Sequence, residues 1–263
     1  MPHILKSELV RVRQGYASHL GLRSEQQDVF ALSDFSDAEF VSHGGYLALV
    51  ADGIGGLQYG AEAAGIATTR FMADYTTKSV EQSVDDALDQ AMIEANNAVC
   101  NTARYLLNCP GRMGTTLLAA LIYREKFHWR SVGDSHLYLC RGGGLTQLNP
   151  DQIFARQLQI LVSAGIINQS YADKHPQRYA LEGYLGLESL PAVERNWQAM
   201  PLCDGDKLLL CTDGVYGVLS AVDMLACLRL EPKSAAQRLC DTVLLRAQPN
   251  QDNLTAVVLA YQM

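Results

Sequence analysis

The chain has 263 residues, of which 48% are hydrophobic and 19% are charged, and these proportions are typical of an ordinary globular protein. A chain of this length can bury one large core or two small ones. Its formal net charge of -7 argues against nucleic acid or an anionic membrane as the main partner, because both repel an acidic surface.

Seven cysteines are scattered along the chain without a C-x-x-C pair, so the sequence predicts neither a disulfide framework nor a zinc site. The first 20 residues contain no apolar stretch of signal-peptide length. No run approaches the ~18 apolar residues that a membrane-spanning helix needs. We therefore expect a cytoplasmic protein without a membrane span.

In the first half of the chain, apolar residues recur with the spacing of strands in some stretches and of helices in others. In chain order, this half is expected to contain a half-buried strand at 9–18, a polar loop, a strand that opens at Asp28, a surface connection at 33–44, an apolar strand at 47–52, and helices at about 61–75 and 83–107.

The second half continues with consecutive strands joined by short turns, which indicates antiparallel sheet. Its expected elements are strands at 114–123, 126–132, 136–141 and 145–148, helical pieces within 151–165 and at 169–174, strands at 192–197 and 206–212, helices at 221–228 and 234–247, and a last strand at 254–261.

No internal repeat or domain boundary interrupts this pattern, so we expect a single domain spanning residues 1–263. An insert at about 149–190 separates two sheet regions and is neither linker-like nor low in complexity. Such an insert is a candidate lid or substrate-facing flap.

The apolar strand at 47–52 ends in Asp52, and a glycine-rich turn and a helix follow. An Asp-Gly pair after a strand usually marks a two-residue hairpin. A hairpin needs a second strand directly afterwards, whereas a helix follows here. Asp52 is therefore expected at the open end of a buried strand, where a sheet presents ligands.

Four further aspartates lie beside the ends of predicted apolar strands. They are Asp28, Asp134, Asp213 and Asp252. Oxygen ligands without His or Cys suit hard cations such as Mg²⁺ or Mn²⁺. The spacing along the chain leaves two alternatives open, because five independent turn aspartates fit the pattern as well as one convergent site.

Six blocks of sequence appear in the order typical of one enzyme family. They are RSEQQD at 23–28, ADGIGG at 51–56, GTT at 114–116, VGDSHLYL at 132–139, CTDGVYGVLS at 211–220 and QDNLT at 251–255. With these blocks, and with LVSAGI and HPQR in the insert, nearly the whole chain resembles the metal-dependent serine/threonine protein phosphatases of the 2C type (the PPM family) in their bacterial form.

The resemblance implies an α+β fold, a four-layer α-β-β-α sandwich of two packed antiparallel sheets flanked by helices. It also implies two tightly bound Mn²⁺ or Mg²⁺ ions, with a third, weaker ion. By position, Asp52 would bridge both metals and the Gly53 carbonyl would ligate one. Asp213 and Asp252 would complete the second metal, Asp28 would hold metal-bound water, and Asp134 with Asp213 would match the third position.

Arg23 matches the family's phosphate-gripping arginine, a role suited to a planar two-donor guanidinium. The implied reaction is hydrolysis of phosphoserine or phosphothreonine on a protein by direct attack of a water shared by two cations. The implied partner is a phosphoprotein, the target of a bacterial serine/threonine kinase, and the chain is expected to act as a monomer.

The chain departs from the family pattern at three positions. Ile54 replaces a histidine that animal relatives use as a candidate general acid, which leaves the source of the leaving-group proton open. Gln26 replaces a common asparagine, and His136 replaces the arginine usual after Gly-Asp-Ser. His136 is a candidate ligand or acid, although strand histidines are more often packed structural residues.

Two other functions compete with an active phosphatase. A catalytically silent relative would bind phosphoproteins without cleaving them, but it would be expected to lack a metal aspartate, and all are present. A two-metal nuclease would need a basic face, and the acidic balance argues against one.

Overall fold

The computed structural model describes residues 11–263, so the first two residues of the strand predicted at 9–18 lie outside the described residues, as does the rest of the segment 1–10. The strands are β1 (Arg11–His19), β2 (Asp28–Leu32), β3 (Tyr46–Asp52), β4 (Leu117–Tyr123), β5 (Lys126–Val132), β6 (His136–Arg141), β7 (Gly144–Gln147), β8 (Glu194–Arg195), β9 (Met200–Pro201), β10 (Lys207–Cys211) and β11 (Leu254–Gln262).

The helices lie in groups between runs of strands along the chain. They are α1 (Ala38–Gly44), α2 (Gly60–Thr76), α3 (Val84–Asn101), the π-helical turn η1 (Thr102–Leu106), α4 (Ala155–Ser163), α5 (Gln169–Lys174), α6 (Asp213–Tyr216), α7 (Ala221–Leu228) and α8 (Pro232–Leu245).

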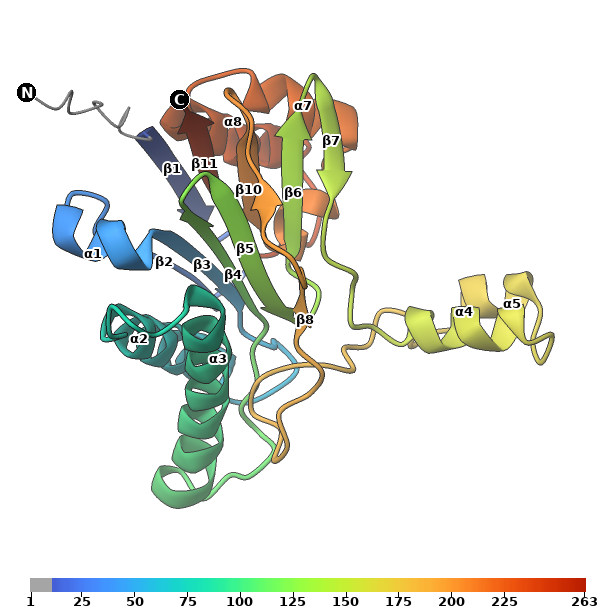
Figure 1. The fold of residues 1–263 in the computed structure, drawn as a ribbon. Helices are drawn as coiled ribbons and strands as arrows, with labels where there is room; N and C mark the ends of the chain where they lie inside the picture. The colour runs from blue at the N-terminus through green and yellow to red at the C-terminus, as the bar shows by residue number, and fades with distance from the viewer. Residues whose placement is uncertain (1–10) are drawn as a thin grey trace, which may run out of the picture.

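Two antiparallel sheets pack face to face, and helices cover their outer faces (Figure 1). One sheet has the strand order β1-β11-β10-β6-β7, and the other has the order β2-β3-β4-β5-β8, with β9 paired to β5. Helices α2 and α3 lie on one side of the molecule, whereas α7 and α8 lie on the other. This arrangement confirms the predicted α+β class and the four-layer α-β-β-α sandwich.

Strand β3 shows why the layers stack in this way. Its residues Leu47, Leu49 and Ala51 pack in the core cluster that includes α2 and α3. The alternate residues, Ala48 and Val50, pack in a separate cluster between the two sheets. Because successive side chains of a strand point to opposite faces, an apolar residue at every position buries both faces at once.

The other sheet is covered in the same way by α7 and α8. Leu209 of β10 and Val258 of β11 pack with Leu228, Ala236 and Leu239 of these helices. The sheet pair is therefore sealed on both sides by apolar contacts. Its strand ends are the places left open for ligands.

Three local predictions are wrong. Residues 33–44 do not form only a surface connection, because α1 begins there with Asp37 accepting a hydrogen bond from Phe40 N, and Phe40 is buried. The strand predicted at 192–197 shrinks to β8, which pairs with β5 over two residues. The sequence analysis assigned no helix directly after β10, yet α6 begins at Asp213.

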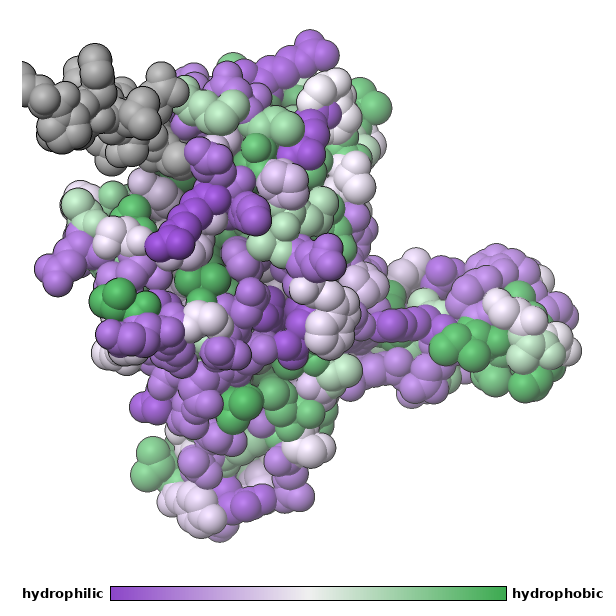
Figure 2. Space-filling model, in the orientation of Figure 1, coloured by the Kyte–Doolittle hydropathy of each residue, from purple (hydrophilic) through white to green (hydrophobic). Residues whose placement is uncertain are grey.

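The insert projects from the body as the pair α4 and α5 (Figure 1). Ile160, Ile166 and Tyr171 expose 62%, 69% and 56% of their surface there. Figure 2 shows hydrophobic surface on this projection, next to a largely hydrophilic body. In residues 11–263, no helix combines the length and the apolar character that crossing a membrane requires.

Gly15→Ala is expected to lower the free energy of unfolding by about 1–3 kcal/mol, because a side chain there overpacks the interface of β1 with α8. A Cβ atom on Gly15 would lie 2.2 Å from the Pro232 carbonyl carbon and from Lys233 N, which are backbone atoms. Urea unfolding of the wild type and the variant measures the difference.

Gly65→Ala in α2 is the matched control, because no atom lies within 4 Å of a Cβ built at that position. Alanine favours a helix over glycine by up to ~1 kcal/mol, so this variant should be as stable as the wild type or more so. A destabilised control together with an unaffected Gly15→Ala variant would contradict the packing argument.

Candidate metal centre

The aspartates predicted from the sequence gather at one end of the sheet pair. Asp28 opens β2 and Asp52 closes β3, and the two residues face each other in the antiparallel register. Asp134 lies in the turn from β5 to β6, Asp213 follows β10, and Asp252 precedes β11. The structure therefore favours one convergent site over five independent turn aspartates.

A cavity of about 620 Å³ opens at this end of the sheets. The predicted site residues that line it are Arg23, Asp52, Gly53, Asp134, Asp213 and Asp252. Asp28 is 5% exposed and stands opposite Asp52. All seven predicted residues thus belong to one neighbourhood.

Hydrogen bonds with the two threonines that directly precede β4 fix the backbone of Asp52. Thr116 N donates to Asp52 O at 2.9 Å, and Asp52 N donates to Thr116 Oγ1 at 2.9 Å. Thr115 Oγ1 also donates to Asp52 O, at 2.9 Å. The sequence gives no role to the GTT block, and in the structure its two threonines hold the backbone of Asp52 in place.

Gly53 occupies a position where a side chain has no room. A Cβ atom there would lie 2.3 Å from Gly60 O, at the start of α2. Gly53 N donates to Gln27 O at 3.1 Å, which ties the turn to the loop before β2. The close approach of three backbone segments explains why glycine follows Asp52.

Burial, and then the crowding of carboxylates, raises the pKa values of the site aspartates. Burial is the main cause for Asp28, whose pKa rises to about 7 although a hydrogen bond from Thr212 opposes the rise. Burial and then the charge of Asp28 raise the pKa of Asp52 well above its usual range. The pKa of Asp134 rises to about 7 through burial and then the charge of Asp213.

Asp213 lines the open cavity, but partial burial of its carboxyl group is the main cause that raises its pKa to about 6. The charge of Asp252 adds to this rise, whereas a hydrogen bond from the Gly214 backbone and the charge of Arg23 oppose it. Burial is the largest cause of all four shifts, and the negative charge of neighbouring carboxylates adds to each of them.

Arg23 contacts a carboxylate of the site. Its Nη2 donates to Asp252 Oδ2 at 2.7 Å, and the other carboxylate oxygen, Oδ1, accepts a hydrogen bond from Asn253 N at 2.8 Å. Both oxygens of Asp252 are therefore engaged within the protein. The sequence assigned Arg23 to a phosphate and Asp252 to a metal, and it could not show that the two residues pair.

The donor set suits a divalent cation, because it consists of carboxylate oxygens without sulfur or imidazole. A divalent cation would also neutralise the negative charge of the aspartates in this partly buried site. In the described part of the chain, no three His, Cys, Asp or Glu side chains are grouped closely enough to hold a metal as they stand.

Three residues of the insert also line the cavity, namely Tyr179, Leu181 and Tyr184. The sequence predicts a lid or substrate-facing flap in the insert but does not single out any of these three residues. Aromatic and aliphatic residues close to the HPQR block were the available signal. Their position gives the acidic cavity one apolar wall.

A family model described as protein phosphatase 2C matches residues 17–259. The chain belongs to the protein phosphatase 2C family. The serine/threonine protein phosphatase PstP of Mycobacterium tuberculosis is 32% identical over 226 residues, which cover 85% of this chain and 42% of PstP. The chain thus spans less than half of the length of that relative.

Solved structures agree with this assignment. The crystal structure of M. tuberculosis PstP superposes with a TM-score of 0.76 at 30% identity, over 97% of this chain and 100% of that one. A structure of the PstP catalytic domain in complex with two manganese ions gives a TM-score of 0.74 at 28% identity, over 97% and 99% of the two chains. These findings confirm the predicted family and fold.

Asp28→Asn is expected to stabilise the metal-free protein by about 1–3 kcal/mol at pH 8, because burying a charge costs more than burying an amide. A folded-state pKa of about 7, above the unfolded value near 4, means that the native state binds more protons between these pH values. The stability of the wild type therefore falls as the pH rises through this window.

Urea unfolding in a chelator at pH 4 and pH 8 measures this effect. The amide oxygen can still accept the hydrogen bond from Thr212, so the variant should resemble the wild type at pH 4 and exceed it at pH 8. An equal gain at both pH values would show that the charge of Asp28 is not the cause.

Proposed function

We propose that the protein is a metal-dependent serine/threonine protein phosphatase, which hydrolyses phosphoserine and phosphothreonine on proteins. The observation that carries this proposal is the cavity in which Asp52, Asp134, Asp213 and Asp252 meet the guanidinium of Arg23. Carboxylates of this kind hold cations, and a guanidinium binds a phosphate. Membership of the protein phosphatase 2C family supports the same reaction.

Asp52 and the Gly53 carbonyl, with Asp213 and Asp252, would hold two Mn²⁺ or Mg²⁺ ions. Asp28 would hold water of the metal shell, and Asp134 with Asp213 would bind a third ion more weakly. The raised pKa values of Asp28, Asp52, Asp134 and Asp213 fit these roles, because a cation favours the ionised carboxylates that burial and mutual repulsion disfavour. When bound, a pair of such ions lowers the pKa of water and neutralises charge on a phosphoryl group.

Arg23 would orient the phosphate through its two-donor guanidinium. Its side chain is 52% exposed and therefore open to a ligand from solution. If Asp252 turns toward a cation, Arg23 Nη2 loses its partner and becomes available to a phosphate oxygen. The ion pair observed here thus keeps Arg23 close to the place where we expect the phosphate.

Ile54 lies in the wall of the cavity and has no ionisable group. The leaving alkoxide must therefore receive its proton from water or from another residue. His136 is not placed to supply it, because both of its ring nitrogens are hydrogen-bonded, to Tyr138 and to Asp151.

A phosphoprotein that is the target of a cognate serine/threonine kinase is the proposed substrate. The apolar wall formed by Tyr179, Leu181 and Tyr184 would contact the residues beside the phosphorylated one, which gives the insert at 149–190 the role of a flap. We propose that residues 1–263 act as one catalytic domain. The monomeric state and the cytoplasmic location stay predictions.

Hydrolysis of p-nitrophenyl phosphate and of a phosphothreonine peptide is expected to require added Mn²⁺ or Mg²⁺ and to stop in excess chelator. Asp52→Ala should reduce kcat/KM by about a hundredfold or more, because it removes a carboxylate that would hold the cations and leaves the backbone unchanged. Steady-state kinetics with and without Mn²⁺ measure both effects.

Asp241→Ala is the control, since Asp241 lies on α8 and accepts a hydrogen bond only from Gln237 among the side-chain contacts of the described residues. It should keep wild-type rates. Full activity after verified removal of metal would contradict the proposed reaction.

Arg23→Ala is expected to raise KM more than it lowers kcat, with a loss in kcat/KM of about 1.5–3 kcal/mol, the typical value of a charge-assisted hydrogen bond. Bound cations would neutralise most of the negative charge that develops on the phosphoryl oxygens, so the loss of Arg23 is expected to affect mainly substrate binding. Arg23→Lys should recover only part of the lost kcat/KM, because the compact ammonium group of lysine cannot replace the two parallel donors of the guanidinium.

Arg246→Ala provides a matched comparison. Arg246 is 50% exposed and pairs with Asp223 at 3.0 Å, much as the 52% exposed Arg23 pairs with Asp252. Loss of a surface ion pair should leave both kinetic constants within about twofold. If Arg23→Ala behaves like this control at saturating Mn²⁺, Arg23 does not hold the phosphate.

A further inference from the structure

The first residues of the insert grip the Asp134 turn from both sides. Before Asp134, Gly133 N donates to Gln152 Oε1 at 3.0 Å, and Gln152 N donates to Gly133 O at 3.1 Å. After it, Asn149 Nδ2 donates to Ser135 O at 2.8 Å. The position of the Asp134 backbone thus depends on a segment that belongs to the insert.

His136 extends this grip to a third element. The residue is 6% exposed, its Nε2 lies 2.8 Å from Asp151 Oδ1, and its Nδ1 lies 2.7 Å from the Tyr138 hydroxyl. The imidazole stacks on Tyr216 of α6, with the ring centroids 3.5 Å apart and the planes 11° apart. Tyr216 in turn donates its hydroxyl hydrogen to Asp134 O at 3.0 Å.

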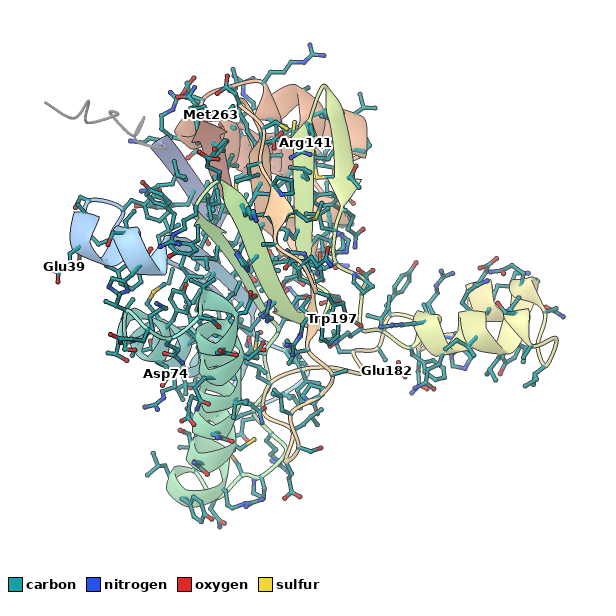
Figure 3. The ribbon with its side chains drawn as sticks, in the orientation of Figure 1. Glu39, Asp74, Arg141, Glu182, Trp197 and Met263 are labelled. Atoms are coloured by element: carbon teal, nitrogen blue, oxygen red, sulfur yellow. The ribbon has the colours of Figure 1, made fainter. Side chains whose placement is uncertain are left out.

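The returning end of the insert is tied to the same segment. Gln152 O accepts a hydrogen bond from Glu182 N at 2.8 Å, and Gln152 Nε2 donates to Ala192 O at 2.5 Å. Figure 3 labels Glu182 where the projecting insert meets the body. Gln152, which is 7% exposed, therefore joins both ends of the insert to the Asp134 turn.

We propose that Asp151 and His136 form a latch between the insert and the catalytic end of the sheets. Through this latch the insert positions Asp134 and the adjoining helix α6, which carries Asp213. The insert also supplies Tyr179, Leu181 and Tyr184 to the cavity wall, so a ligand that shifts it acts on Asp134 through the latch. His136 and Asp151 are positioning residues, because neither is among the residues that line the cavity.

Two variants of Asp151 separate the latch from a simple charge effect. Asp151 is also one of the negative charges that act on Asp134. Asp151→Ala removes both the charge and the acceptor of the His136 bond, whereas Asp151→Asn removes the charge and keeps a carbonyl oxygen as acceptor. The latch predicts that the Asn variant resembles the wild type, and a charge effect predicts that it resembles the Ala variant.

Hydrogen–deuterium exchange of the metal-free protein tests the latch without reference to catalysis. In Asp151→Ala, amides of residues 133–137 and of 152–154 should exchange about tenfold faster, because the opening of one segment releases the other. The control is Asp173→Ala, which removes a carboxylate that contacts Arg178 within the insert, and its effect should stay within residues 168–178. His136→Phe keeps an aromatic ring on Tyr216 but loses both nitrogens, and should reproduce Asp151→Ala.

Kinetics with Mn²⁺ supply the second readout, and this part rests on the proposed phosphatase function. Asp151→Ala should lower kcat by about tenfold with KM within about twofold, as expected for the loss of one positioning hydrogen bond. Asp151→Asn and Asp173→Ala should keep rates close to those of the wild type.

Unchanged exchange at 133–137 in both Asp151→Ala and His136→Phe would overturn the latch, and so would an Asn variant as impaired as the Ala variant. If one variant fails to fold, the other still decides the exchange experiment. A wild type without activity in Mn²⁺ would instead refute the proposed function, and the exchange comparison would still decide whether the latch exists.

Discussion

Repulsion among buried carboxylates is the constraint on which the rest of this structure depends. Asp28 and Asp52 face each other across two strands, and the pKa values of both are raised by burial and by like charge. Two ionised carboxylates on directly paired strand residues would move apart if their backbones were free to move. The sheets prevent this movement, because β3 is buried on both faces. One face packs against helices, and the other packs against the second sheet. The core therefore stabilises an arrangement that its charged end opposes.

Hydrogen bonds from short polar side chains fix the positions of the site aspartates. Thr115 and Thr116 bind the backbone of Asp52, and Thr212 donates to the side chain of Asp28. Ser135 lies beside Asp134, with its hydroxyl 2.8 Å from that of Thr116. Threonine and serine suit these positions because they offer a hydroxyl at little conformational cost and carry no charge that would neutralise the site. The negative charge of the site aspartates is therefore left to be neutralised by a ligand.

The sequence was sufficient for most strands, for the layers and for the residues of the site, but not for their contacts. Period-two patterns and apolar runs located the strands, and ordered motifs located the aspartates. Helix α1 was missed because a short polar stretch conceals the buried Phe40. The pairing of Arg23 with Asp252 joins residues 229 positions apart, and no local pattern encodes such a contact. The link between His136 and Asp151 was hidden for a related reason, because only the path of the insert brings the two together.

The same electrostatics link the two ligands that we propose for the site. Four carboxylates and one guanidinium line the cavity, so a phosphate dianion entering it without a cation meets net repulsion. Cations reverse the sign of this interaction, and by thermodynamic reciprocity a bound phosphate must then tighten the binding of the cations. Arg23 adds a second favourable contribution to the coupling between metal and phosphate, because its ion pair with Asp252 competes with the metal for Asp252 and with the phosphate for Arg23. If the proposed function is correct, Arg23 stays paired with Asp252 in the metal-free protein. Binding of metal and binding of phosphate would each favour the other, because both require this ion pair to break.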